Sequence, residues 1–187
     1  MAERLNRAAV VARAAQLADE IGLEELTITK LARELGVTPP GIYRHVTDLA
    51  DLRRAIGGLA AREAAAELAT ACAGLSGAAA LAALAAALRA WAKRHPARYA
   101  ALQEAPDPDD AEGSAAAEAL IAVMATALRA YGLAGDNLTD AIRLIRSTLH
   151  GFIALEGGDG FKQRRSVEAS FERIVAALDG VLVGWGR

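Results

Sequence analysis

Apolar side chains recur every three or four positions along most of this chain, the spacing that places them on one face of a helix. The stripe nearest the N-terminus lies within residues 5–21 and ends at Gly22, a residue type that commonly ends a helix. The next stripe comprises Ile28, Leu31, Ala32 and Leu35. Further stripes predict helices over residues 48–71, 78–94, 114–132, 136–156 and 166–184, with a short helix after His95-Pro96. No segment alternates in the way typical of a strand, so the pattern predicts an all-α protein.

Composition favours the same fold class. Alanine supplies 47 of the 187 residues, and it has the highest intrinsic helix propensity of the amino acids. A chain of this length can bury a full core, as one large or two small domains. It contains no run of about 18 uncharged apolar residues that would span a membrane, and residues 1–22 lack the apolar block of a signal peptide. We therefore expect a protein without membrane contact that stays in the cytoplasm.

The most informative segment is residues 27–46, TITKLARELGVTPPGIYRHV. Thr27 stands where a helix N-cap is expected, and Gly36 can adopt the left-handed backbone that ends a helix before a tight turn. Thr38 is a second N-cap candidate, followed by Pro39 at the first helical position. In the short second helix, Ile42 and Val46 are the apolar positions. Its other side presents Gly41, Tyr43, Arg44 and His45, which is the arrangement of a helix that enters the major groove of DNA.

The segment and its surroundings resemble the tetracycline-repressor (TetR) family of bacterial transcriptional regulators. The matching stretches are AAQLADEIG from Ala14, LTITKLARELGV from Leu26, PPGIYRHV from Pro39 and a helix opened by Thr47-Asp48-Leu49. Further on, STLHGFIALEGGDGF (147–161) and SFERIVAAL (170–178) resemble the Trp-His-Gly type of ligand-binding domain, of which only His150-Gly151 is evident here. The resemblance implies a three-helix DNA-binding domain over residues 1–47. It also implies a helical effector-binding and dimerisation domain over residues 48–187, with residues 48–71 as the connecting helix.

The family resemblance also implies which residues approach DNA. Thr27 and Thr47 are expected to touch phosphate, and the others to approach bases or backbone. The predicted DNA-binding residues are Thr27, Thr29, Lys30, Thr38, Pro39, Gly41, Tyr43, Arg44, His45 and Thr47. The guanidinium of Arg44 can bond guanine O6 and N7 together, although a solvated surface arginine is the alternative. The phenol of Tyr43 can donate to phosphate, and the alternative is packing against Val46.

Charge is a weaker indication of DNA binding. The formal net charge is −2, and residues 1–62 hold nine Lys/Arg against eight Asp/Glu. Affinity must therefore come from the local placement of a few cations rather than from a large positive field. Leu49 also stands where the family often has a lysine, which removes one expected phosphate contact. Arg53 or Arg54, one turn later, is a possible substitute.

The C-terminal half is expected to bind an effector and a second subunit. Aromatic residues cluster after residue 90, and such a cluster is either core or pocket. The predicted effector-pocket residues are Trp91, Tyr99, Met124, Tyr131 and His150. The last two long helices resemble those that form a four-helix interface between subunits in the family. The predicted interface residues are Ile142, Ile145, Leu149, Ile153, Phe171, Ile174 and Leu178.

These expectations combine into one predicted function. A two-fold homodimer places two recognition helices about one DNA turn apart, which suits a palindromic operator in double-stranded DNA. A small-molecule effector that favours one tilt of the helix over residues 48–71 would change that separation. We therefore expect a repressor that an unidentified small molecule releases from its operator.

Other function classes find less support in the sequence. The chain has three histidines and no Ser/His/Asp or Cys/His constellation, phosphate-binding loop or metal-ligand spacing, so we expect neither an enzyme nor a cofactor. Its single cysteine, Cys72, cannot form an internal disulfide. The acidic segment 103–113 is predicted to be a solvated loop. The alternative that stays open is a helical ligand-binding or protein-interaction module whose helix-turn-helix no longer reads DNA.

Overall fold

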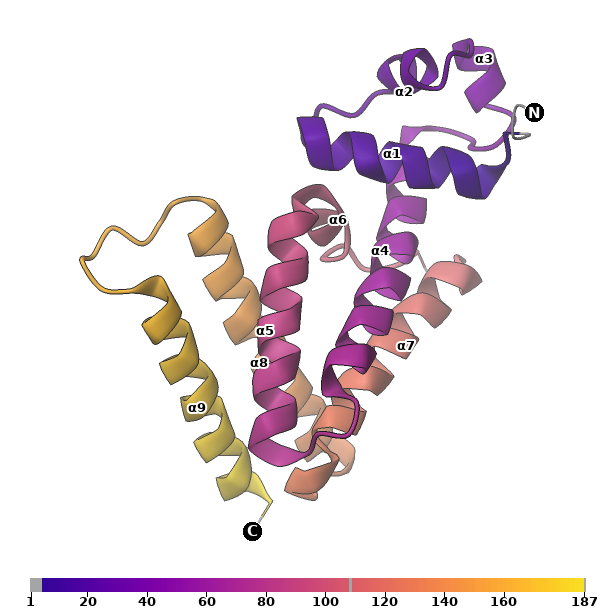
Figure 1. The fold of residues 1–187 in the computed structure, drawn as a ribbon. Helices are drawn as coiled ribbons and strands as arrows, with labels where there is room; N and C mark the ends of the chain where they lie inside the picture. Colours follow the sequence, from indigo (N-terminus) through magenta and orange to yellow (C-terminus); the bar gives the residue numbers. More distant parts are fainter. Residues whose placement is uncertain (1–4, 108, 187) are drawn as a thin grey trace. The chain divides into compact units, whose positions relative to one another are not determined.

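The computed structural model describes residues 5–107 and 109–186, and in these residues all regular structure is helical (Figure 1). The elements are α1 (Arg7–Ile21), α2 (Ile28–Glu34), α3 (Pro39–Ile42), α4 (Leu49–Cys72), α5 (Gly77–Arg94), α6 (Pro96–Ala101), α7 (Ala111–Ala127), the 3-10 turn η1 (Arg129–Tyr131), α8 (Gly135–Gly157) and α9 (Val167–Trp185). The predicted all-α fold is confirmed. None of the described helices is long and apolar enough to cross a membrane.

Local sequence signals explain how the helix-turn-helix begins and turns. The Thr27 side-chain oxygen accepts a hydrogen bond from the Lys30 amide at 3.2 Å, as expected of an N-cap. Gly36 has a φ of +65°, the left-handed conformation that the turn after α2 requires. Thr38 does precede α3, but its side chain makes no capping hydrogen bond. Pro39 therefore provides the start of α3 through its fixed φ.

The predicted helix over residues 114–132 has different limits in the structure. It begins at Ala111, because the Asp110 side chain accepts a hydrogen bond from the Gly113 amide at 2.9 Å and so satisfies one free donor of the first turn. It ends at Ala127, and the 3-10 turn η1 follows and ends at Gly132, which has a φ of +69°. The acidic loop is accordingly shorter than predicted at its C-terminal end.

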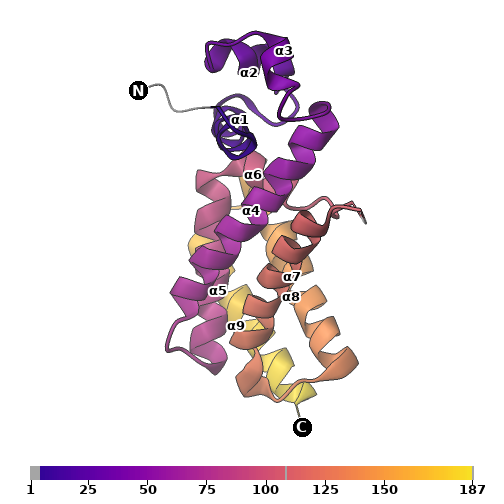
Figure 2. The same ribbon diagram turned by 90° about the vertical axis from the view of Figure 1, so that its right-hand side faces the viewer.

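The helices form two compact units. Unit 1 comprises residues 1–63 and 94–119, and unit 2 comprises residues 64–93 and 120–187. The long helix α4, seen from the side in Figure 2, contributes residues to both units. The boundary predicted between residues 47 and 48 therefore differs from this division by packing, because α6 packs against α1 and so joins the N-terminal head, which is formed by α1, α2, α3 and the start of α4.

Unit 1 has a core that holds α1, α2 and α3 together. The predicted apolar positions Leu31, Ile42 and Val46 are at most 2% exposed. They pack with the buried faces of α1 and the first half of α4, and with Ala97 and Ala101 of α6. Because α3 has only four residues, it cannot be stable as an isolated helix. Its position depends on Ile42 and on the segments before and after it.

A polar clamp fixes those segments. The Arg7 guanidinium donates to both carboxylate oxygens of Asp51, at 2.7 and 3.0 Å, and to the backbone carbonyl of His45 at 2.8 Å. Asp51 also accepts from the Thr47 amide at 2.8 Å, and Asp48 accepts from the Asp51 amide at 2.7 Å. The Arg7 hydrogen bonds lower the pKa of Asp51 to about 2. The clamp thus ties the start of α1, the end of the α3 turn and the start of α4 to one another.

Unit 2 is organised around a buried arginine. The guanidinium of Arg89 on α5 donates to both carboxylate oxygens of Glu156 on α8, each at 2.7 Å, and to Glu168 on α9 at 2.6 Å. It also lies over the rings of Phe171 and Phe152, at 4.5 and 5.5 Å from their centroids. The side chain of Arg89 is 9% exposed, so it needs these partners to offset its lost hydration. Its hydrogen bonds lower the pKa of Glu156 to about 2.

The clamp predicts a stability effect that depends on pH. Asp51→Asn removes the charge, whereas the amide oxygen can still accept from the Thr47 amide. We expect the free energy of unfolding to fall by about 1–2 kcal/mol near neutral pH, since Arg7 is half-exposed and water screens part of the pair. The folded-state pKa of Asp51 is about 2, below its ordinary value of 3.8. The stability that the Asp51 carboxylate contributes is therefore complete above pH 3.8 and is lost as the pH falls towards 2.

The difference between wild type and Asp51→Asn, measured by urea unfolding, should therefore shrink on acidification. Glu20→Gln is the matched control, because Glu20 pairs with Arg13 at 3.3 Å on an exposed part of α1. It should cost less than about 0.5 kcal/mol. A difference for Asp51→Asn that is independent of pH would contradict the assigned role of the carboxylate.

In unit 2, we expect Arg89→Met to cause a larger loss of stability than Asp51→Asn causes in unit 1. Removing the guanidinium leaves Glu156 without its bidentate partner, which should lower the free energy of unfolding by about 2–4 kcal/mol. Lys93→Met is the control, because Lys93 contacts the same carboxylate at 2.7 Å but has a half-exposed side chain. We expect that control to cost less than about 1 kcal/mol. Unfolding of both variants can be monitored by the fluorescence of the buried Trp91. Equal losses of stability in the two variants would contradict a special role for Arg89.

Candidate nucleic-acid interface

The ten predicted DNA-binding residues all lie on the surface of unit 1. Each is exposed or half-buried, whereas Ile42 and Val46 of the same segment point into the core. The exposure of Tyr43 favours a ligand contact over packing against Val46. The residue follows α3 directly and is 53% exposed. The phenol is accordingly available to a ligand.

Arg44 follows Tyr43 and is exposed too. Within residues 5–107 and 109–186 its side chain takes part in no hydrogen bond or ion pair, so its guanidinium donors are available to a ligand. Gly41, one turn earlier, has room for a Cβ, which would come no closer than 3.7 Å to the Val37 side chain. A glycine at this position is therefore not required by packing within the chain. Both features suit a surface that another molecule approaches closely.

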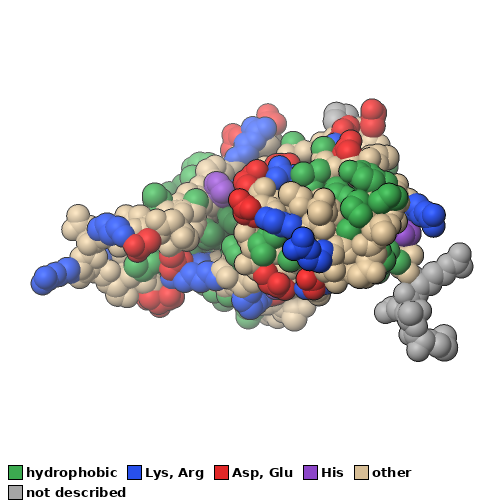
Figure 3. Space-filling model, turned by 90° about the horizontal axis from the view of Figure 1, so that it is seen from above, with side chains coloured by type: hydrophobic (Ala, Val, Ile, Leu, Met, Phe, Trp, Pro, Cys, Tyr) green, Lys and Arg blue, Asp and Glu red, His purple; other side chains and the backbone are tan. Residues whose placement is uncertain are grey.

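Two other cations near this surface, Lys30 and Arg53, are paired with acids. Lys30 donates to the Glu25 carboxylate at 2.9 Å and to the Glu25 carbonyl at 2.8 Å. The Lys30 hydrogen bond lowers the pKa of Glu25. Arg53 donates to Glu24 and to the Leu23 carbonyl, each at 3.2 Å. Positive and negative side chains also alternate on the face drawn in Figure 3. Lys30 and Arg53 must therefore exchange these partners before they can contact phosphate.

Leu49, in the place of the expected lysine, has a structural use. It is half-buried and packs against the core of unit 1. Of its suggested substitutes, Arg53 is paired, and Arg54 is half-buried beside a small cavity of about 40 Å³ that Gly57 and Gly58 also line. The start of α4 is thus fixed by packing and by the Arg7–Asp51 clamp instead of offering a free cation.

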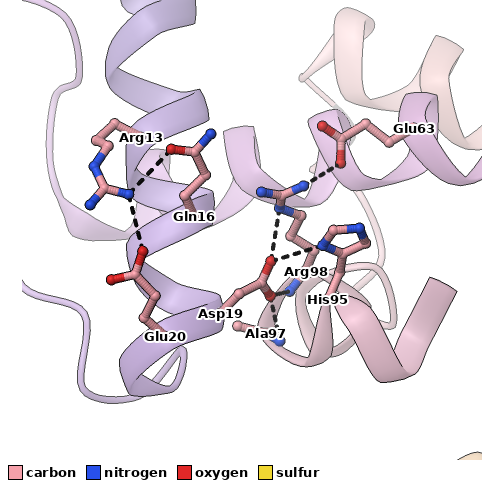
Figure 4. A network of polar contacts seen from close by, with 8 residues as sticks. All are labelled: Arg13, Gln16, Asp19, Glu20, Glu63, His95, Ala97 and Arg98. Carbon is pink, nitrogen blue, oxygen red and sulfur yellow. Dashed lines mark hydrogen bonds and ion pairs between the residues drawn. The ribbon is translucent and has the colours of Figure 1, made fainter.

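A second polar network joins α6 to the head (Figure 4). One carboxylate oxygen of Asp19, on α1, accepts from the amides of Ala97 and Arg98 at 3.0 and 3.1 Å, and so caps the N-terminus of α6. The other oxygen lies 3.3 Å from His95 Nδ1 and 3.1 Å from Arg98 Nε. Arg98 also donates to Glu63 on α4 at 2.9 Å. Asp19 and Arg98 thereby connect α1, α6 and the middle of α4.

Sequence reasoning missed this network. Asp19 and Arg98 are 79 positions apart, so no local spacing signals the contact. The available signal was His95-Pro96, which marks the start of a helix whose free amides need an acceptor. The acid that supplies the acceptor lies on the half-buried side of α1, at the edge of its apolar stripe.

Four of the five predicted effector-pocket residues are buried. Trp91, Met124 and Tyr131 are 2%, 3% and 8% exposed in unit 2, and Tyr99 is 8% exposed in unit 1. The Tyr131 hydroxyl donates to Asp179 at 2.6 Å, and burial together with this bond raises the pKa of Tyr131. His150 differs, because it lies on the exposed side of α8. That exposure removes it from the interior at which the prediction placed it.

Burial also changes the expected position of the subunit interface. Six of the seven predicted residues are at most 8% exposed in the single chain, and these are Ile142, Ile145, Leu149, Ile153, Phe171 and Leu178. Their side chains already pack inside unit 2, and Ile174 alone is half-buried. Neighbouring stripes of the same two helices face outward instead. They comprise Leu144, Thr148, Gly151 and Leu155 on α8, and Ile174, Ala177, Val181 and Gly184 on α9.

Two family models match the chain. Residues 10–56 match the bacterial regulatory proteins of the tetR family, and residues 81–178 match the tetracyclin repressor-like C-terminal domain. An uncharacterized HTH-type transcriptional regulator of Mycobacterium tuberculosis is 36% identical over 154 residues, which cover 82% of this chain and 71% of that protein. The class D tetracycline repressor of Escherichia coli is 46% identical over 43 residues, covering 23% of this chain and 20% of the repressor.

Solved structures share the fold. A TetR transcriptional regulator from Streptomyces coelicolor superposes with a TM-score of 0.75 at 20% identity, over 98% of this chain and 100% of that one. TetR from Acinetobacter baumannii in complex with minocycline gives a TM-score of 0.73 at 20% identity, over 98% and 99% of the two chains. The regions matched by the family models include α2, α3, all of α8 and α9 as far as residue 178. The chain belongs to the TetR family of DNA-binding transcriptional regulators.

Proposed function

We propose that this regulator binds a palindromic operator as a homodimer and represses transcription until a small molecule releases it. The observation that carries the proposal is the surface around α3. Tyr43 and Arg44 are exposed there, and Arg44 has no partner within the described residues. The clamp formed by Arg7 and Asp51 holds that surface in place. Binding to chromosomal DNA also implies a cytoplasmic location.

Direct base reading is assigned to Arg44. Its guanidinium can donate two parallel hydrogen bonds to one guanine, which is the commonest specific contact in the major groove. Thr27, Tyr43 and Thr47 are assigned to phosphate, because each carries a hydroxyl on an exposed side chain at the edge of the helix-turn-helix. Phosphate contacts fix the register of the protein on the duplex, and the base contact supplies the sequence preference.

Regulators of this family bind small-molecule ligands, and the A. baumannii TetR structure contains minocycline. For this chain we assign the effector to the buried aromatic region of unit 2, around Trp91, Met124 and Tyr131. Release requires that the effector favours one arrangement of the helices over another. Helix α4 supports such a link, since it contributes residues to both units, and the Asp19–Arg98–Glu63 network ties it to α1 and α6 within unit 1.

Dimerisation is assigned to the outward stripes of α8 and α9. These stripes lie beside the buried ones, and their members are small or apolar. A Cβ added at Gly151 or Gly184 would meet no atom within 4 Å, so the chain itself leaves this surface uncovered. Leu155 and Val181 are 53% and 42% exposed on it. A second copy packed with two-fold symmetry would bury the same side chains from both subunits.

One set of observations favours the alternative of a module that does not read DNA. Lys30 and Arg53 are paired with acids, and Leu49 replaces a cation. These features reduce the positive charge available to phosphate. The exposed Arg44 and Tyr43 distinguish the two functions, because a module without DNA binding gives them no role.

Arg44→Ala tests the assigned base contact. The DNA is the region upstream of the gene for this protein, or a sequence selected from a random pool. We expect affinity for that DNA to fall by about 5- to 150-fold, the value of one bidentate base contact, with little change for random DNA. Fluorescence anisotropy with labelled duplexes measures both. The preference for one base pair should be relaxed most strongly.

Arg129→Ala is the matched control, because Arg129 is an exposed arginine of η1 in unit 2 and its loss changes the net charge equally. It should leave affinity and preference unchanged. An equal, small loss for both variants would show a general charge effect and contradict base reading by Arg44. Wild-type affinity for the selected DNA that is no higher than for random DNA would favour the non-reading module.

Val181→Glu tests the assigned dimer surface. Val181 is exposed in the single chain, so the substitution should leave the fold intact but place a charge within the interface. We expect the mass in solution, measured by light scattering after size exclusion, to change from dimer to monomer. Ile121→Glu introduces the same charge at an equally exposed position of α7, 40% against 42%, and should remain dimeric. A dimeric Val181→Glu protein would contradict this interface.

A further inference from the structure

The connection between α8 and α9 has a defined conformation. Asp159 has a φ of +53°, and the Gly160 amide donates to the Leu155 carbonyl at 2.7 Å, so the chain folds back on the end of α8. Asp159 forms an ion pair with Lys162. At the other end, the Ser166 side chain accepts from the Ala169 amide at 3.2 Å and caps α9. The loop, drawn in orange to gold in Figure 1, is therefore held at both ends.

This connection encloses one side of a cavity of about 380 Å³ in unit 2. Its volume lies within the range typical of small-molecule sites, about 300–1,000 Å³. The apolar part of the lining is Phe152, Phe161, Val167 and Ile174. The polar part is Lys162, Gln163, Arg165 and Ser170, on the connection and the first turns of α9.

The apolar part is rigidly supported. The ring of Phe152 lies 4.8 Å from that of Phe161 and 5.1 Å from that of Phe171, in tilted aromatic contacts. Behind these rings, the Arg89 guanidinium lies 4.5 Å from the Phe171 centroid. The positive charge of Arg89 is already paired with Glu156 and Glu168, so Arg89 is not available to bind an anion in the cavity. The cavity thus offers a preformed aromatic wall.

The polar part is cationic. Residues 161–166, FKQRRS, contain three cations and no acid. Arg165 uses Nε to donate to the Ser170 hydroxyl at 3.2 Å, and in the part of the chain that the structure describes its two Nη groups make no hydrogen bond. Lys162 pairs with Asp159, which is itself exposed. Two adjustable cations therefore lie at the rim of an aromatic cavity.

We propose that this cavity is a binding site for an amphipathic carboxylate, a ligand with an aromatic or branched apolar body and one terminal carboxylate. The body packs against Phe152, Phe161 and Val167, and the carboxylate accepts hydrogen bonds from Arg165 and Lys162. The site differs from the effector region around Trp91, Met124 and Tyr131, since it has none of those residues in its lining. Its occupancy does not depend on DNA binding.

The test uses 4-phenylbutyrate and its uncharged analogue 4-phenylbutyramide with the full-length protein. Titration calorimetry should show saturable binding of the carboxylate. In amide NMR spectra, the largest shifts should fall on residues 160–170. In the Lys162→Gln/Arg165→Gln variant, affinity for the carboxylate should fall by about tenfold or more, because two charge-assisted hydrogen bonds are lost. Affinity for the amide should stay the same in both proteins.

Arg164→Gln is the matched control, since Arg164 is exposed on the same connection but does not line the cavity. It should bind 4-phenylbutyrate like the wild type, and inorganic phosphate should produce no comparable shifts in any variant. Equal losses with Arg164→Gln, or equal binding of phosphate, would show a general charge effect and overturn the proposal. No saturable binding, or binding only to the monomeric Val181→Glu protein, would overturn it too.

Discussion

The pairing of Arg7 with Asp51 is the interaction on which the proposed DNA-reading surface depends. The helix that presents this surface, α3, has four residues and receives no side-chain cap from Thr38. Such a short element takes its position from what flanks it. The clamp joins the carbonyl of His45, the amide of Thr47 and the start of α1 through one carboxylate and one guanidinium. Everything proposed for Tyr43 and Arg44 requires that this arrangement persists in solution.

The head binds DNA with little net positive charge, and the structure shows how its acids are arranged. Glu24, Glu25 and Glu34 pair with Arg53, Lys30 and Arg13 respectively. These pairs stabilise the folded head only slightly, since they are exposed. Their larger effect is on binding: a paired cation must leave its carboxylate to reach phosphate, which lowers affinity for random DNA. An unpaired Arg44 keeps its full capacity for a base. We therefore expect such a head to discriminate between DNA sequences but to bind random DNA weakly.

Local features of the fold were predictable from the sequence, and long-range ones were not. Thr27, Gly36 and Pro39 act through neighbouring backbone, so their spacing predicted the helix-turn-helix. Asp19 and Arg98 meet only through tertiary packing, which no spacing encodes. In α8 and α9, apolar residues occupy both the inner and the outward stripes. Periodicity alone could not separate core from interface, so the predicted interface residues are largely those of the core.

The central claim is that the chain recognises a particular operator through the α3 surface. The most direct test titrates the purified protein against DNA from upstream of its own gene, and against random DNA, over a range of salt concentrations. The account predicts binding that depends on a palindrome, with log affinity falling by about 0.9 per phosphate contact for each log unit of salt. Few free cations predict a shallow slope and weak binding to random DNA. Equal binding to both DNAs at every salt concentration would contradict the account.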